Sequence, residues 1–189
     1  MNRKVPGTTL KFSEQARESA FSLIYPVLEA TGGLTLSQLS KLTGLEGSTI
    51  QNWIKRGWVS STKGKKYSER QVLRILLINM LRGSMKLEDI AKLMRYVNGD
   101  VEDTSDDIID DANLYNILCR IIFTAEDKGA FSSDSVKRLI DNELIASASS
   151  VRSDEEKLRQ AMFVMIMAYR SAYLKQEMES VLTTILNEN

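Results

Sequence analysis

The side chains best suited to recognition chemistry in this chain are Gln51, Asn52 and Lys55. Ile50 and Trp53 are three positions apart, so a helix would turn them to one face and leave the polar side chains on the other. Gln and Asn can pair bidentately with adenine in the major groove of DNA, and Lys suits a phosphate. The pattern favours a helix that presents hydrogen-bonding groups to a nucleic acid.

Hydroxyl and basic side chains on either side of this segment extend the candidate set. Side chains of these types contact phosphates and fix the register of a protein on a duplex. The further DNA-binding candidates are Lys41, Ser48, Thr49, Arg56, Lys63, Lys65, Lys66 and Tyr67. We expect the lysines beyond residue 62 to place charge on the DNA backbone or in a neighbouring groove.

Charge is divided unevenly along the chain, although 25 Lys and Arg residues balance 25 Asp and Glu residues overall. Residues 34–98 hold 12 basic and 4 acidic side chains, whereas residues 99–189 hold 9 basic and 18 acidic ones. Phosphate neutralisation by Lys and Arg supplies most non-specific binding to nucleic acid. We therefore expect the basic segment to bind a polyanion, and the acidic segment to be repelled by DNA.

Residue types that carry catalysis and metal binding are scarce. The chain has no His, the commonest general base and metal ligand, and its one Cys leaves no disulfide and no zinc site of the N/S type. Cys119 lies in an apolar run, so we expect a buried thiol. Four Asp residues between 106 and 111 lack the spacing of a calcium loop and are interpreted as a solvated helix start. We expect no enzymatic activity, no metal and no cofactor.

Capping-box patterns at residues 35–38 and 48–51 mark the starts of two short helices. Gly44 ends the first helix, and Gly57 ends the second at a position that favours a left-handed residue. Two helices of about two turns joined by a tight turn form a helix-turn-helix pattern. Two roles stay open for Gln51, because a Gln that completes a capping box bonds the backbone and cannot read a base.

Beyond this helix pair the pattern changes to short extended segments. Residues 58–61 and 65–67 are typical of the two strands of a small β-hairpin, or wing, with Gly64 in the turn. The rest of the chain alternates between apolar segments with helical spacing and turn residues. We expect helices at about 13–29, 68–82, 87–98, 105–126, 132–148 and 153–186.

The best domain boundary is the acidic stretch that starts at Gly99, because it is polar and poor in apolar residues. We predict an N-terminal helix in residues 1–33, a basic head in residues 34–98 and an acidic α-helical domain in residues 99–189. The predicted fold class is mainly α.

The order helix, turn, helix, wing, helix, helix over residues 34–98 resembles the winged DNA-binding head of MerR-type transcription regulators. Residues 36–44 resemble their first helix and turn, residues 49–57 their recognition helix, and residues 66–68 the exit of their wing. Residues 20–98 also resemble an uncharacterised bacterial family with a MerR-like head and an α-helical tail. The resemblance implies a winged helix-turn-helix with a small β-hairpin, followed by an α-helical bundle or dimerisation tail.

The acidic tail contains one segment, residues 161–173, in which apolar side chains surround a helix on most sides. We interpret it as a bundle core or a dimer seam, and a hydrophobic effector pocket is the alternative. One recognition helix contacts few base pairs, and two heads on a two-fold axis raise specificity, so we expect a homodimer.

These observations predict a cytoplasmic, sequence-specific protein that binds double-stranded DNA and regulates transcription without catalysis. No secretory signal is evident, and no apolar stretch is long enough to span a bilayer. The alternative is a protein–protein adaptor that uses its winged module without binding DNA. The target sequence, the regulated process, the direction of regulation, any effector and the dimer geometry stay open.

Overall fold

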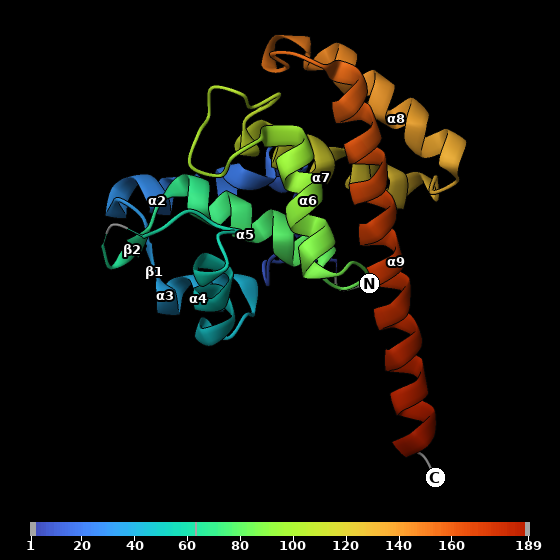
Figure 1. The fold of residues 1–189 in the computed structure, drawn as a ribbon. Coiled ribbons are helices and arrows are strands. Elements are labelled where there is room, and N and C mark those ends of the chain that lie inside the picture. Colours follow the sequence, from blue (N-terminus) through green and yellow to red (C-terminus); the bar gives the residue numbers. More distant parts are fainter. Residues whose placement is uncertain (1–2, 63, 188–189) are drawn as a thin grey trace.

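The computed structural model describes residues 3–62 and 64–187, and this part of the chain is mainly helical (Figure 1). Short helices come first and longer ones follow. In chain order the elements are α1 (Glu14–Glu18), the 3-10 helix η1 (Ala20–Leu23), α2 (Tyr25–Thr31), β1 (Leu34–Thr35), α3 (Leu36–Thr43), α4 (Gly47–Lys55), β2 (Lys66–Tyr67), α5 (Glu69–Leu81), α6 (Leu87–Asn98), α7 (Asp111–Lys128), α8 (Ser133–Ala146), the 3-10 helix η2 (Ala148–Ser150) and α9 (Glu155–Asn187).

The small sheet differs from the predicted hairpin. Its two antiparallel strands are β1 and β2, with Leu34 opposite Tyr67, so the partner of β2 lies before the helix pair. Residues 58–61 form no strand, and the predicted hairpin is wrong in this respect. Instead, the amide of Gln71 donates to Ser60 O at 2.8 Å and to Thr62 Oγ1 at 3.1 Å, so a side chain holds the segment that was expected to pair.

The predicted N-terminal helix is broken into α1, η1 and α2. Ser13 caps α1, because its side chain accepts a hydrogen bond from Ala16 N at 3.2 Å. Pro26 lies in the first turn of α2, where a missing N–H costs nothing, so it starts a new helix rather than kinking a long one. The helix predicted at 105–126 begins only at Asp111. Like Ser13 in α1, Asp110 is the N-cap of α7, because its side chain accepts a hydrogen bond from Asn113 N at 2.8 Å.

Residues 3–12 precede α1 and its cap, and we call them the N-terminal arm. Hydrogen bonds to three later segments hold this arm against the rest of the protein, which we call the body. Tyr115 in α7 donates its hydroxyl to Pro6 O at 2.7 Å. Asn79 in α5 donates to Gly7 O at 2.8 Å, and Thr9 N donates to Leu42 O at 2.7 Å at the end of α3. The arm therefore joins the helix pair to the body.

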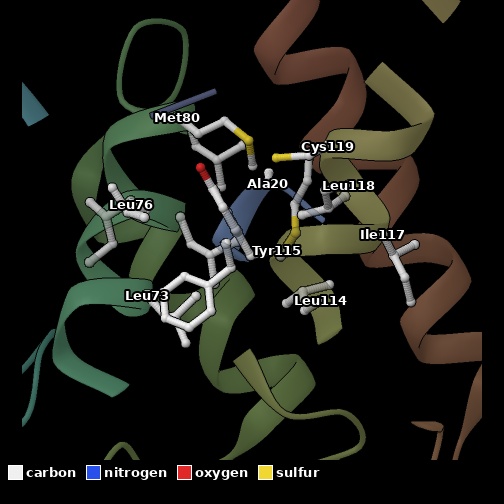
Figure 2. Close-up of a cluster of buried hydrophobic side chains, with 14 of the residues drawn as sticks. Ala20, Leu73, Leu76, Met80, Leu114, Tyr115, Ile117, Leu118 and Cys119 are labelled. Atoms are coloured by element: carbon white, nitrogen blue, oxygen red, sulfur yellow. The ribbon is translucent and has the colours of Figure 1, made fainter. Parts of the chain in front are cut away.

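One hydrophobic cluster extends from Val5 to Ala168 and contains side chains from all three predicted parts of the chain. Helix α5 is buried on nearly every side and forms its centre. Figure 2 shows Leu73 of α5 and Tyr115 of α7 packed in this cluster, with Cys119 beside them. The predicted boundary at residue 99 is therefore not a break in packing, and the expected buried thiol of Cys119 is confirmed.

Helix α9 runs along the body and then continues away from it, so its C-terminal half projects from the molecule (Figure 1). Its last buried residue is Ala172. Within residues 3–62 and 64–187, no helix combines the length and the hydropathy needed to cross a membrane.

Candidate nucleic-acid interface

The helix pair α3 and α4 is positioned by local sequence signals. The capping box predicted at the start of α3 is confirmed: Gln38 accepts from Thr35 N at 2.8 Å, and Thr35 Oγ1 accepts from Gln38 N at 3.3 Å. Gly44 ends α3 with a φ of 71°, a left-handed conformation that favours Gly. The chain then turns sharply and enters α4.

Helix α4 starts two residues earlier than its predicted capping box requires. The helix begins at Gly47, its N-cap is Glu46, and no side chain caps this end. Ser48 therefore lies within the first turn, and the predicted Ser48–Gln51 capping box is wrong. The consequence is favourable for recognition, because the Gln51 amide has no capping role that would occupy it.

The two faces of α4 are separated as the spacing predicts. Ile50 and Trp53 are fully buried in the core. Gln51, Asn52 and Lys55 are exposed on the other side of the helix. Ser48 is also exposed, and Thr49 is half-buried. We call the exposed side chains Ser48, Gln51, Asn52 and Lys55 the α4 surface.

Four further cationic candidates flank α4 in the sequence, and the structure describes three of them. Lys41 in the last turn of α3 and Lys65 before β2 are exposed. Arg56 is exposed as well, but its Nη1 lies 3.4 Å from Glu88 Oε1 and its guanidinium stacks over the ring of Trp58. Lys63 lies outside the described residues. In the described part of the chain, Arg56 is the one predicted site residue that forms an ion pair.

The two remaining candidates, in β2, are placed differently from the others. Lys66 is exposed, and its Nζ donates a hydrogen bond to Thr31 O at the end of α2. Tyr67 is buried beneath the sheet, and burial raises the pKa of its hydroxyl. The Tyr67 ring therefore supports the strand pair from inside and is not part of an exposed interface.

One acidic side chain and one backbone carbonyl from a loop that the sequence did not assign to this region lie against it. Glu102, in the loop between α6 and α7, accepts a hydrogen bond from Ser61 N at 3.0 Å. In the same loop, Asp103 O accepts a hydrogen bond from Arg70 Nη2 at 3.2 Å. These contacts link distant parts of the chain, and only the acidic composition of the loop pointed to them. They hold the connection between α4 and β2 beside α5.

Behind this region a charged cluster is buried between α5, α6 and α7. Arg74 Nε lies 3.4 Å from Asp111 Oδ2, and Asn98 donates to Asp111 Oδ1 at 3.1 Å. Asp107 is also buried, and burial raises the pKa of both carboxyl groups. The interpretation of these carboxylates as a solvated helix start is therefore wrong for Asp107 and Asp111. Asp111 pairs there with the guanidinium of Arg74, from a segment distant in sequence, and Asp107 lies within the field of Arg70 and Arg74.

The guanidinium of Arg74 is incompletely satisfied by protein atoms. Its Nε and Nη1 are buried, and neither forms a hydrogen bond with another described group. Arg74 also lines a small cavity together with Trp58 and Arg95, between the end of α4 and α6. Buried water commonly occupies such polar cavities, so this one can complete the hydrogen bonding of the guanidinium.

Comparison with known proteins finds similarity over the part of the chain that contains this region. Residues 28–118 match a family described as "Domain of unknown function (DUF1836)". The match runs from α2 into α7 and crosses the boundary predicted at residue 99, in agreement with the shared core. The chain is 30% identical over 91 residues to "Uncharacterized protein YkrK" from Bacillus subtilis (strain 168), which covers 46% of this chain and 39% of that relative. The chain thus spans well under two thirds of the relative's length. No solved structure matches.

Proposed function

We propose that this chain binds double-stranded DNA through the α4 surface, as a sequence-specific transcriptional regulator without catalysis. In this proposal α4 enters the major groove and reads base edges with Gln51 and Asn52, while Lys55 and Ser48 contact phosphates. Lys41, Arg56 and Lys65 add charge beside the helix. A protein that binds DNA must be in the same compartment as the DNA. We expect this compartment to be the cytoplasm.

The observation that carries the proposal is the contrast between the two faces of α4. Ile50 and Trp53 anchor the helix in the core, so its exposed face is held on a rigid support. Two amide side chains stand next to each other on that face, and a lysine follows one turn later. Rigid presentation matters because bidentate hydrogen bonds to a base tolerate little misplacement.

The resemblance of residues 34–98 to the MerR-type head is part of the same proposal. A helix pair followed by a basic connection and a strand would act as a winged helix-turn-helix, with residues 58–67 as the wing. The pairing of β1 with β2 supports this assignment, because it ties the end of the wing to the start of the helix pair. A wing held in this way would move with α4 as one unit.

A fluorescence anisotropy titration of random-sequence duplex DNA at several salt concentrations tests the proposal. Lys41, Lys55, Arg56 and Lys65 are four exposed cations, so the slope of log K against log salt should be about −3 to −4 for each bound head. Absence of binding at low salt, or binding that does not weaken as salt is raised, would contradict the proposal.

A protein–protein adaptor is the second candidate function, and one contact favours it. Arg56 already pairs with a carboxylate, Glu88, at the edge of the α4 surface. A partner with an acidic surface could use the same chemistry on Lys55 and Lys41. Purification without nuclease separates the two candidates: a DNA-binding head carries nucleic acid that absorbs at 260 nm, whereas an adaptor does not.

A further inference from the structure

Helix α9 carries a second apolar stripe that faces away from the body. We call it the outer stripe, and its members repeat at alternating spacings of three and four residues. They are Val164, Met167, Ser171, Leu174, Met178 and Val181. Met167 is half-buried and also touches the core at the edge of the stripe, and Ser171 is its one polar member. Four of them are large apolar side chains that are strongly exposed, at 42% for Val164, 47% for Leu174, 55% for Met178 and 60% for Val181. This 3.5-residue period is the signature of a helix that pairs with another helix.

The outer stripe lies opposite the face by which α9 packs on its own body. The buried face includes Leu158, Met165 and Ala172. At about 100° per residue, these positions and the outer stripe are centred about 150° apart on the helix. Both faces can therefore be used at once, because Val164, Leu174, Met178 and Val181 are exposed while Met167 keeps its contact with the core at the edge of the stripe.

The body holds α9 only as far as Ala172. Ser84, in the turn between α5 and α6, donates to Ala168 O at 2.7 Å. The Cα of Gly83 approaches the Ala172 side chain so closely that a Cβ there would lie 2.7 Å from Ala172 Cβ. Every described residue from 174 to 187 is exposed. A lone helix of this length is marginal in water, so the projecting half needs a partner to be stable.

We infer that the outer stripe pairs with the outer stripe of a second copy of this chain, with the two α9 helices antiparallel. When the two-fold axis passes between Ser171 and Leu174, Ser171 faces the Leu174 position of the second copy. Moving outward, Met167 then faces Met178 and Val164 faces Val181. The projecting half of each helix covers the docked half of the other, so all six positions of the stripe find a partner. The match of the two halves in length favours a second copy over an unrelated helix.

Charges beside the stripe select the antiparallel orientation. In this arrangement Arg170 of one copy faces Glu177 of the other, and the symmetry makes this attractive contact twice. In a parallel pair Arg170 would face Lys175 instead, which gives two repulsive contacts. Both members of the attractive pair are held in place, since Arg170 stacks on the rings of Phe131 and Tyr173, and Glu177 accepts from Tyr173 Oη at 2.8 Å.

Sedimentation equilibrium of the full chain over a range of concentrations tests the inference. We expect twice the chain mass, and a chain that stays monomeric at all concentrations would overturn the inference. The double variant Met178→Asp with Val181→Asp should weaken the dimer about a hundredfold or more, because it places four carboxylates in the seam. The matched control is Ser180→Asp, which adds a carboxylate at the same height on the opposite side of α9 and should leave the dimer unchanged. A dimer that resists the double variant would also overturn the inference.

Charge reversal and cross-linking test the orientation. Glu177→Arg should weaken the dimer, and the addition of Arg170→Glu should restore it, because the two positions face each other only in the antiparallel pair. Under oxidising conditions Val164→Cys with Val181→Cys should cross-link two chains, whereas Val181→Cys alone should not. The native Cys119 is buried and does not interfere. Efficient cross-linking of Val181→Cys alone would show a parallel pair and overturn the antiparallel assignment. This inference does not depend on DNA binding.

Discussion

Arg74 and Asp111 form an ion pair in the interior, 3.4 Å apart, with side chains only 4% and 5% exposed. This pair connects α5 at the centre of the core with the first residue of α7. Removal of one partner of a buried pair leaves the other charge without compensation, which typically costs about 3–5 kcal/mol. The pair therefore fixes how the basic and acidic segments are joined.

The first prediction concerns this pair. Asp111→Asn should lower the free energy of unfolding by about 3 kcal/mol or more, since the Arg74 guanidinium remains charged and buried. Asp110→Asn is the control, because Asn is as good an N-cap as Asp and should change stability by less than about 0.5 kcal/mol. Urea denaturation measures both values. Equal effects of the two substitutions would show that the buried pair has no special role.

The second prediction concerns Asp107, which is buried with one carboxyl oxygen that has no hydrogen-bond partner among the described groups. Burial raises the pKa of this carboxyl group above its ordinary value, so the folded state holds the proton at a pH where the unfolded state has released it. The contribution of Asp107 to stability is therefore fully present below the unfolded pKa and is lost as pH rises through the folded pKa.

Asp107→Asn removes this titration. The variant and the wild type should be close in stability at acidic pH, and the variant should become the more stable protein as pH rises above the ordinary pKa of Asp. Urea denaturation at a series of pH values measures the difference. A stability difference that does not change with pH would contradict the assigned titration.

The third prediction concerns the N-terminal arm. Tyr115→Phe removes the hydroxyl that donates to Pro6 O in a buried position, and the unsatisfied carbonyl should cost about 1–3 kcal/mol. Tyr25→Phe is the matched control, because the Tyr25 hydroxyl is exposed and its contact with Glu29 is 3.3 Å long. Thermal unfolding should separate the two variants clearly. Equal melting temperatures would show that the arm is not held by this bond.

Local signals predicted much of the fold correctly. The helices α3, α5, α6, α8 and α9 lie close to their expected positions, because apolar spacing and caps are properties of neighbouring residues. The exposed and buried faces of α4 followed from the same spacing. Cys119 was predicted to be buried from the apolar run around it, and it is.

Apart from the local errors at Ser48 and in the N-terminal helix, the features that were missed depend on contacts between distant segments. The partner of β2 is Leu34–Thr35, more than 30 residues earlier in the chain, and no local pattern shows this pairing. Asp111 is buried against Arg74, and Asp107 near Arg70 and Arg74, and these arginines lie outside the acidic segment that contains the two carboxylates. The Glu102 contact with Ser61 N is of the same kind. Local charge composition does not show which charges meet after folding.

The fourth prediction concerns base recognition. Gln51→Ala and Asn52→Ala should each relax sequence preference by about 1–3 kcal/mol at one base pair, with a smaller effect on binding to random DNA. Selection of bound sequences from a random duplex pool, performed with the wild type and each variant, measures the change. Identical selected sequences for all three proteins would exclude these amides as the reading groups.

The most direct test of the proposed interface compares two charge reversals in DNA binding at low salt. Lys55 lies on the α4 surface, whereas Lys128 lies at the end of α7. Lys55→Glu and Lys128→Glu change the net charge by the same amount. Both side chains are exposed, so both variants should keep the fold, which circular dichroism can verify. We predict that Lys55→Glu reduces the affinity for duplex DNA by about tenfold or more, and that Lys128→Glu leaves it within about twofold. Equal losses from the two variants, or no loss from Lys55→Glu, would contradict recognition of DNA by α4.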